Sequence, residues 1–338
     1  MPAVLIPLDL RAAMPARGSV VHQFGGASMG TTWTVRVAGA PDMAPERTSI
    51  WAAQLQRQLD DVVAQMSHWD SASLLARFND APAGSWHRLP PEFFTVLTYA
   101  LALGEDSGGA YDACAGALVD AWGFGATGRY NQPGFQPPPR ARIDALLVAR
   151  ATTAIELDPL YRRALQPGGL RLDFSSVAKG FAVDQLARLL DAQGFAHYLV
   201  ELGGELRGAG MKPDGQPWWV AIEGVPGAAA DSEVRIALHG LALATSGDYR
   251  RHFQYGARRA AHTLDPRSGV PLDNGVASVS VLHAQCMAAD ALSTALTVLG
   301  PDEGLAFADA RQLAARFLLR SGRTLREVTS AAWRAMLQ

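Results

Sequence analysis

The chain has 338 residues, of which 49% are hydrophobic and 18% are charged. This balance is typical of a globular protein with a substantial core, and the length accommodates one large domain or two ordinary ones. The formal net charge is −2, so the overall charge gives no reason to expect a nucleic-acid partner.

Cysteine usage and apolar runs argue against further classes. The two cysteines, Cys114 and Cys286, lack the spacing of a zinc site or a disulfide framework. No apolar run reaches the roughly 18 residues of a membrane span. Residues 1–23 contain a short, broken apolar run that does not form a secretory signal, and we expect them to be a loose lead-in to a single domain over 24–338. The cytoplasm is the favoured compartment, and the periplasm is the alternative if a leader is missing.

The first third of the chain contains strand, helix and loop patterns. The glycine-rich segment Phe24–Thr32 predicts a flexible turn that feeds a strand over Trp33–Val37. Apolar residues at helical spacing predict a helix over Arg47–Met66, and proline and glycine bracket a second helix over Pro91–Gly104. Trp69 lies in a polar loop between them. Its ring is suited either to stack on a planar ligand or to cover the protein surface.

The middle and end of the chain are richer in strands. Glycine, proline and glutamine cluster over Ala126–Arg142, which predicts a surface excursion. The remaining apolar runs predict strands over Ala154–Leu157, Leu170–Asp173, Tyr198–Leu202, Trp218–Ile222, Val234–Leu238, Val276–Leu282 and Ala315–Leu319.

Two serines follow the strand that is expected to end at Asp173. A helix is expected from this point to about Ala192, and Ser175 or Ser176 is suited to cap it. Hydroxyls and free N–H groups at a helix start also form a site for phosphate. Lys179, one of two lysines in the chain, lies in the same segment. The residues alone leave capping and phosphate binding open.

A second helix is expected over Cys286–Leu299, a run without glycine or proline that is rich in alanine, leucine and methionine. Asp290 and Thr294 are four residues apart and therefore share one face of it. A carboxylate on an apolar helix needs a partner, and a hard cation such as Mg²⁺ would supply one. The alternative is that the threonine bonds back to a carbonyl one turn earlier and the aspartate is solvated or capped.

Eight blocks of the chain, taken together and in order, resemble the ApbE family of Mg²⁺-dependent FAD:protein FMN transferases. The likeness runs from about Gly25 to Leu319. The blocks are SMGTTW, MSHWDSASLLARFN, WGFG, DFSSVAKGFAVD, VELGGELRGAG, ATSGDY, HTLDPRSGVP and AADALSTAL.

The resemblance implies a mixed α+β fold related to the T-fold, with two lobes and FAD bound between its halves. The positions that it assigns to FAD binding are Met29, Trp69, Ala110, Tyr111, Asp112, Asp173, Lys179 and Leu264. It assigns Mg²⁺ binding to Ser176, Asp290 and Thr294, with Ser176 acting through its carbonyl oxygen.

The implied reaction transfers the FMN moiety of FAD to a threonine hydroxyl of an acceptor protein and releases AMP. His262 is the candidate general base for that hydroxyl, because imidazole titrates near neutrality, and Asp265 is a candidate to orient it. A histidine that only holds its loop is the alternative. Two other functions remain open: an FAD pyrophosphatase that gives FMN and AMP, and a non-catalytic FAD-binding or storage protein.

Overall fold

The computed structural model describes residues 3–9, 13–42, 45–126, 129–222, 224–225, 234–248, 252–255, 258–322 and 324–338. The chain divides into two compact units. Unit 1 comprises Met1–Asp61, Lys179–Gly247 and Gly275–Gln338. Unit 2 comprises Val62–Ala178 and Asp248–Asn274.

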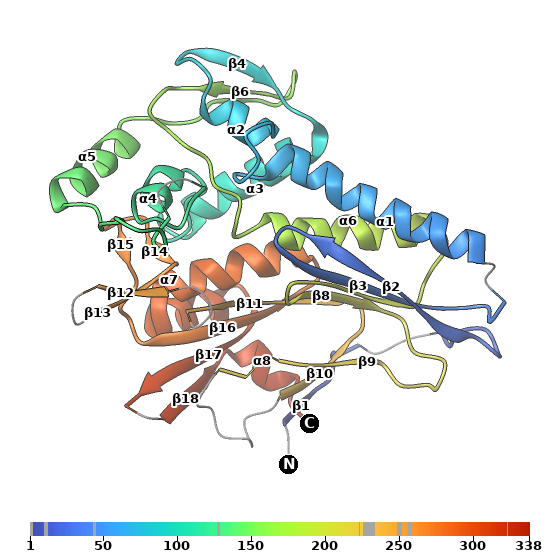
Figure 1. The fold of residues 1–338 in the computed structure, drawn as a ribbon. Helices are drawn as coiled ribbons and strands as arrows, with labels where there is room; N and C mark the ends of the chain where they lie inside the picture. Colours follow the sequence, from blue (N-terminus) through green and yellow to red (C-terminus); the bar gives the residue numbers. More distant parts are fainter. Residues whose placement is uncertain are drawn as a thin grey trace. The chain divides into compact units, whose positions relative to one another are not determined.

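Unit 1 is built on an eight-stranded sheet in the order β18-β17-β16-β11-β8-β7-β3-β2, in which every neighbouring pair is antiparallel (Figure 1). Its strands are β2 (Val20–Ser28), β3 (Thr31–Gly39), β7 (Tyr198–Leu202), β8 (Glu205–Ala209), β11 (Leu241–Gly247), β16 (Val276–His283), β17 (Ala314–Ser321) and β18 (Thr324–Thr329). The central strand β16 is buried along almost its whole length, because both faces of the sheet are covered.

Two layers cover this sheet. Helices α6 (Ala178–Ala192) and α7 (Cys286–Ala310) lie on one face (Figure 1). The other face carries α8 (Ala331–Ala335) and a small sheet of β1 (Ala3–Leu5), β10 (Val234–Leu238) and β9 (Trp218–Ala221). An apolar cluster that includes Leu5, Trp218, Leu243, Leu282 and Trp333 joins the small sheet and α8 to the large one. Burial of these side chains is the main force that holds the layers together.

Unit 2 combines short helices with small sheets. Its helices are α2 (Leu74–Asn79), α3 (Pro91–Asp106), α4 (Gly116–Ala121) and α5 (Arg140–Ala151), and the end of α1 (Pro45–Met66) belongs to it. Its strands are β4 (Ser85–Arg88), β5 (Leu157–Asp158), β6 (Arg163–Gln166), β12 (His252–Tyr255), β13 (Arg258–Ala261), β14 (Leu264–Asp265) and β15 (Val270–Pro271). No helix in the described ranges is long and apolar enough to span a membrane.

The structure confirms the α+β class and places a helix in each of the four predicted ranges, although α7 continues past Leu299 to Ala310. It corrects four expectations, the first of which is the strand over Ala154–Leu157, because β5 begins only at Leu157. Residues 24–28 are not a flexible turn, because they pair with β3 as part of β2. Leu170–Asp173 is not a strand, because only Arg171 forms a bridge, to Ala115. The lead-in is not wholly loose, since β1 pairs with β10. Helices α2, α4, α5 and α8 are not among the predicted elements. The pairing of β1 with β10 and the Ala115–Arg171 bridge join residues distant in sequence, which local patterns do not reveal, whereas β2 pairs with the next strand of the chain.

Candidate active site

The first group of candidate residues lies in unit 1, where α6, α7 and β8 are tied together. Helix α7 begins at Cys286 without a capping side chain of its own. The buried Asp184 of α6 takes that role: its carboxylate accepts from the backbone N–H groups of Cys286 (3.0 Å) and Met287 (2.9 Å). Arg207 of β8 donates to the same carboxylate. A negative charge at a helix start is electrostatically favourable, so Asp184 fixes the beginning of α7.

Asp290 lies one turn along α7 and is only 6% exposed. Its Oδ2 accepts a hydrogen bond of 2.9 Å from the backbone N–H of Gly180. Burial raises the pKa of Asp290, although Lys179 and the Gly180 hydrogen bond act in the opposite direction. The fold thus holds a costly carboxylate inside unit 1, which is typical of a functional site.

Lys179 supplies the positive charge next to this carboxylate. Its Nζ donates to Oε1 of Glu205, the first residue of β8. Burial lowers the pKa of Lys179, but the Glu205 and Asp290 carboxylates outweigh it, and the net shift is upward. One lysine faces two carboxylates, so the cluster carries a formal charge of −1 when all three groups are ionised. That excess favours an additional cation.

Thr294 behaves differently from its neighbours on α7. Ser293 and Thr297 bond back to the carbonyls of Asp290 (2.8 Å) and Ser293 (2.7 Å), as the simpler interpretation of the sequence expects. Within the described part of the chain, the half-buried Thr294 hydroxyl makes no such bond. Its oxygen therefore remains available to a ligand on the Asp290 face of the helix.

Gly180 allows α6 and α7 to approach each other closely. A Cβ atom at this position would lie 2.3 Å from the Cys286 carbonyl oxygen and 2.7 Å from Asp290 Cβ. We therefore expect Gly180→Ala to lower the free energy of unfolding by about 1–3 kcal/mol, because neither helix backbone can yield without distortion. Urea denaturation measures this. Gly224→Ala is the control, since a Cβ there meets nothing within 4 Å; an equal effect of both variants would contradict the close-packing argument.

Met29, the other unit 1 candidate, occupies the tight turn between β2 and β3. Its φ is +50°, which makes it one of three residues other than glycine with positive φ among those described. This left-handed conformation costs an ordinary side chain roughly 1–2 kcal/mol. A methionine kept in a strained turn points to a functional constraint.

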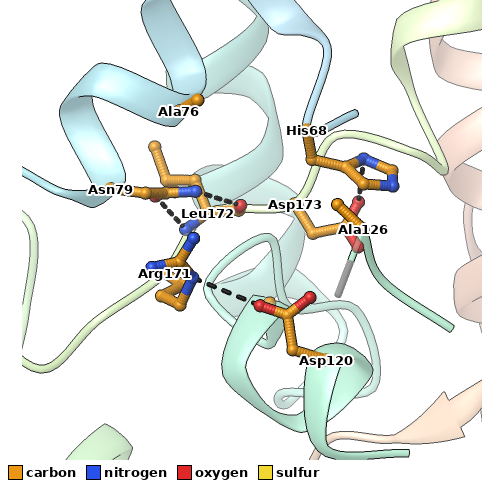
Figure 2. Close-up of a pocket in the computed structure, with 9 residues that line it drawn as sticks. His68, Ala76, Asn79, Asp120, Ala126, Arg171, Leu172 and Asp173 are labelled. Atoms are coloured by element: carbon orange, nitrogen blue, oxygen red, sulfur yellow. Dashed lines mark hydrogen bonds and ion pairs between the residues drawn. The ribbon is translucent and has the colours of Figure 1, made fainter. Parts of the chain in front are cut away.

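The second group lies in unit 2, around Asp173 and a pocket of about 50 Å³ (Figure 2). Asn79 holds the segment before Asp173 through both backbone groups of Leu172, at 2.7 and 2.9 Å. Asp173 Oδ1 accepts from the Ser175 N–H (2.7 Å) and lies 3.7 Å from His68 Nδ1. The sequence analysis did not single out Asn79, although it is the last residue of the MSHWDSASLLARFN block.

Trp69 lies at the surface of unit 2 with 42% of its area exposed. The Arg129 guanidinium lies 4.4 Å from the centre of the indole ring, and the His68 ring lies 4.7 Å from it at a tilt of 43°. The ring thus has charged and aromatic neighbours and an exposed area, and its stacking on a ligand stays a prediction.

The segment Ala110–Asp112 is firmly anchored in unit 2. Ala110 and Tyr111 are buried, and the Tyr111 hydroxyl accepts a hydrogen bond of 3.1 Å from Ser176 Oγ. The Asp112 carboxylate binds Arg150 of α5 at 2.7 and 3.1 Å and the Cys114 N–H at 2.9 Å. The side chains of Asp112 and Ser176 are therefore occupied within unit 2, which leaves their backbone groups as candidates for ligand contact.

His262 and Asp265 lie in the loop around β14. The half-buried His262 ring is edge-on to Phe124, with 6.3 Å between the ring centres. Asp265 forms a two-point ion pair with Arg267, with both N···O distances at 3.0 Å. Leu264 is buried in an apolar cluster with Phe124. The structure thus gives Asp265 a partner other than His262, and the orienting role of Asp265 stays a prediction.

These features define a two-unit α+β protein whose unit 1 combines a buried carboxylate and a half-buried hydroxyl on one helix face with a lysine that interacts with the carboxylate. The sequence matches the ApbE family over residues 29–317, and the chain belongs to that family. The resemblance stated from the sequence is confirmed.

Three relatives match over nearly their whole length. An FAD:protein FMN transferase of Vibrio cholerae serotype O1 is 35% identical, with 98% of this chain and 97% of the relative covered. The solved structure of the Pseudomonas stutzeri flavinyl transferase ApbE, in its apo form, superposes with a TM-score of 0.84 at 36% identity and covers 96% of this chain and 98% of its own. The flavin transferase ApbE of Vibrio cholerae gives a TM-score of 0.83 at 32% identity, with 94% and 99% covered.

Proposed function

We propose that the chain transfers the FMN moiety of FAD to a threonine hydroxyl of an acceptor protein, with Mg²⁺ as cofactor and AMP as the leaving product. Family membership and the names of the relatives support flavin transfer. The observation that carries the proposal is the α7 face on which the buried Asp290 carboxylate lies one turn from the Thr294 hydroxyl, which makes no hydrogen bond within the described ranges.

The residues of unit 1 fit Mg²⁺. This ion prefers oxygen ligands and is usually held by one or two carboxylates together with waters and substrate phosphates. Asp290 and Thr294 supply a carboxylate and a hydroxyl, and Ser176 in unit 2 is the third ligand that the resemblance predicts. No group of three or more His, Cys, Asp or Glu side chains suited to a metal occurs in the described ranges. When bound, the ion would neutralise charge on the FAD phosphates.

The remaining residues would bind FAD and move one proton. Lys179 is placed to attract the pyrophosphate through its positive charge. His262 would accept the proton of the acceptor threonine as its oxygen attacks the FMN-side phosphorus. The bond from that phosphorus to the bridging oxygen then breaks, and AMP leaves with the oxygen. Met29, Trp69, Ala110, Tyr111, Asp112, Asp173 and Leu264 are proposed to contact FAD.

Met29 offers a test of the FAD assignment that separates stability from binding. We expect Met29→Gly to raise the free energy of unfolding by about 0.5–1 kcal/mol, since relief of the positive φ exceeds the entropic cost of glycine. FAD should bind roughly 10-fold more weakly, because burial of a methionine side chain against a ligand contributes about 1.5 kcal/mol or more. Denaturation and FAD titration measure the two effects. Arg162→Gly, at a second positive φ of 45°, should stabilise without weakening FAD binding.

Product analysis distinguishes the three candidate functions. The protein is incubated with FAD and Mg²⁺, with and without an acceptor domain, and AMP and free FMN are quantified by chromatography. Transfer predicts that AMP forms only with the acceptor and that little free FMN appears. Equal amounts of AMP and FMN without acceptor would show a pyrophosphatase. Bound FAD with no AMP under either condition would show a storage protein.

A further inference from the structure

Glu205 is placed by a tight hairpin between β7 and β8. Gly203 and Gly204 form the two-residue loop, both with positive φ (62° and 106°), and Leu202 pairs with Glu205 across it. Two residues with positive φ are the signature of a turn that fixes strand register. The register therefore sets which face of β8 the Glu205 side chain occupies.

The buried face of β8 carries two charges that match two charges on α6. Glu205 and Arg207 are two residues apart, so they point to the same side of the strand. Glu205 accepts from Lys179, and Arg207 donates to Asp184. In the first pair β8 supplies the negative charge and α6 the positive charge, and in the second pair these roles are reversed. Only Asp184 also binds the start of α7, through the Cys286 and Met287 N–H groups. The Asp184–Arg207 pair therefore has a structural role at the start of α7. The Lys179–Glu205 pair has no such contact with α7 N–H groups and needs a separate explanation.

Lys179 and Glu205 differ in their exposure to solvent, and this difference indicates which of them can contact a ligand. The Lys179 side chain is 30% exposed, whereas that of Glu205 is 4% exposed. Glu205 Oε2 is buried and has no hydrogen-bond partner in the described part of the chain. A buried, half-satisfied carboxylate is a cost to folding. Such a cost is expected where the group has a functional task, and Glu205 is too buried to perform that task on a ligand directly.

We infer that Glu205 is a positioning residue for flavin transfer, which holds the Lys179 ammonium next to Asp290 so that its exposed part meets the FAD phosphates. This inference rests on the proposed function. Glu205 forms no bond with the substrate and acts through Lys179. Without the carboxylate, the flexible lysine chain would leave this position, and a displacement of about 1 Å at a reacting centre costs up to roughly 100-fold in rate.

The test is a double-mutant cycle of Glu205→Gln and Lys179→Met, measured as kcat/KM for FAD and as Kd for FAD by titration. Glutamine keeps the size of the side chain and removes its charge. We expect Glu205→Gln to lower kcat/KM by roughly 10–100-fold in the wild-type background. In the Lys179→Met background it should change kcat/KM by less than about 2-fold. Glu327→Gln is the control, because it removes the charge from an ion pair with the buried Arg316 on the β17–β18 hairpin, away from the proposed site residues.

The outcomes separate this inference from the proposed function. If the wild-type protein is active, two results would overturn the positioning role. One is an equal loss of kcat/KM from Glu205→Gln in both backgrounds, and the other is no loss of kcat/KM in the wild-type background. If the wild-type protein releases no AMP, the proposed function fails, and the same cycle read as FAD affinity still decides the role of Glu205. If Glu205→Gln does not fold, Glu205→Asp, which keeps the charge on a shorter side chain, takes its place in the cycle with the same expected coupling to Lys179.

Discussion

Replacing Asp290 with alanine is expected to lower the rate of Mg²⁺-dependent AMP release from FAD in the presence of an acceptor domain by roughly 10³-fold, because the proposed Mg²⁺ site would lose the carboxylate that α7 supplies. Stability should change much less. The substitution leaves the Gly180 N–H without its partner, which costs about 1–3 kcal/mol, but it also removes a buried charge whose pKa is raised by desolvation. The two effects oppose each other. AMP release is followed by chromatography and stability by urea denaturation.

Two further variants isolate the charge of Asp290. Asp290→Asn keeps an oxygen that accepts from Gly180, so it should be as inactive as the alanine variant and nearer to wild type in stability. Asp302→Ala removes an exposed carboxylate from the later part of α7 and should leave the rate unchanged. An Asp290→Asn enzyme with near-normal Mg²⁺-dependent turnover would contradict the metal assignment.

Asp184→Ala is expected to reduce the free energy of unfolding by about 3–5 kcal/mol, the usual cost of leaving a mostly buried charge without its partner. The Asp184 carboxylate accepts hydrogen bonds from Arg207 and from two backbone N–H groups at the start of α7. The variant would remove this acceptor from all three donors. Asp290 lies one turn further along the same helix, so activity should fall as well. Chemical denaturation measures the stability change.

The matched control for Asp184 is Asp191→Ala on the same helix. Asp191 is exposed, and its carboxylate accepts from the Tyr198 hydroxyl at 3.0 Å, so its loss should cost about 1 kcal/mol. The double variant Asp184→Ala/Arg207→Leu should recover part of the lost stability, because no buried cation remains unpaired. A loss below about 1 kcal/mol for Asp184→Ala alone would refute its role as the remote cap of α7.

The sequence predicted those elements whose stabilisation is local. Helices α1 and α3 follow from apolar spacing and from the positions of proline and glycine, and the structure agrees with their bounds within a few residues. Helix α7 begins at Cys286 as predicted but continues to Ala310, past a break in helical geometry at Gly300. Strand β2 was missed at Phe24–Ser28, because only its pairing with β3 makes this glycine-rich segment a strand. The failed strand at Leu170–Asp173 shows the converse: strand propensity without a neighbouring strand yields a single bridge.

Some residues of the candidate site could likewise be predicted from local sequence, and others could not. The spacing of Asp290 and Thr294 on one helix face was readable, and so was the prominence of Lys179 among two lysines. Glu205 and Asp184 were not singled out, because their partners come from other elements of unit 1. A signal was present for both: a charged pair two apart on β8, opposite two charges of reversed sign on α6. It becomes informative only when the two elements are known to be adjacent.

The most direct measurement of the central claim is the intact mass of an acceptor domain after incubation with this protein, FAD and Mg²⁺. The proposed function predicts a gain equal to one covalently bound FMN, absent when Mg²⁺ is chelated, when the acceptor threonine is replaced by alanine, or when the enzyme carries Asp290→Ala. An acceptor of unchanged mass, from a reaction in which FAD has been converted to FMN and AMP, would contradict flavin transfer and identify the protein as a pyrophosphatase.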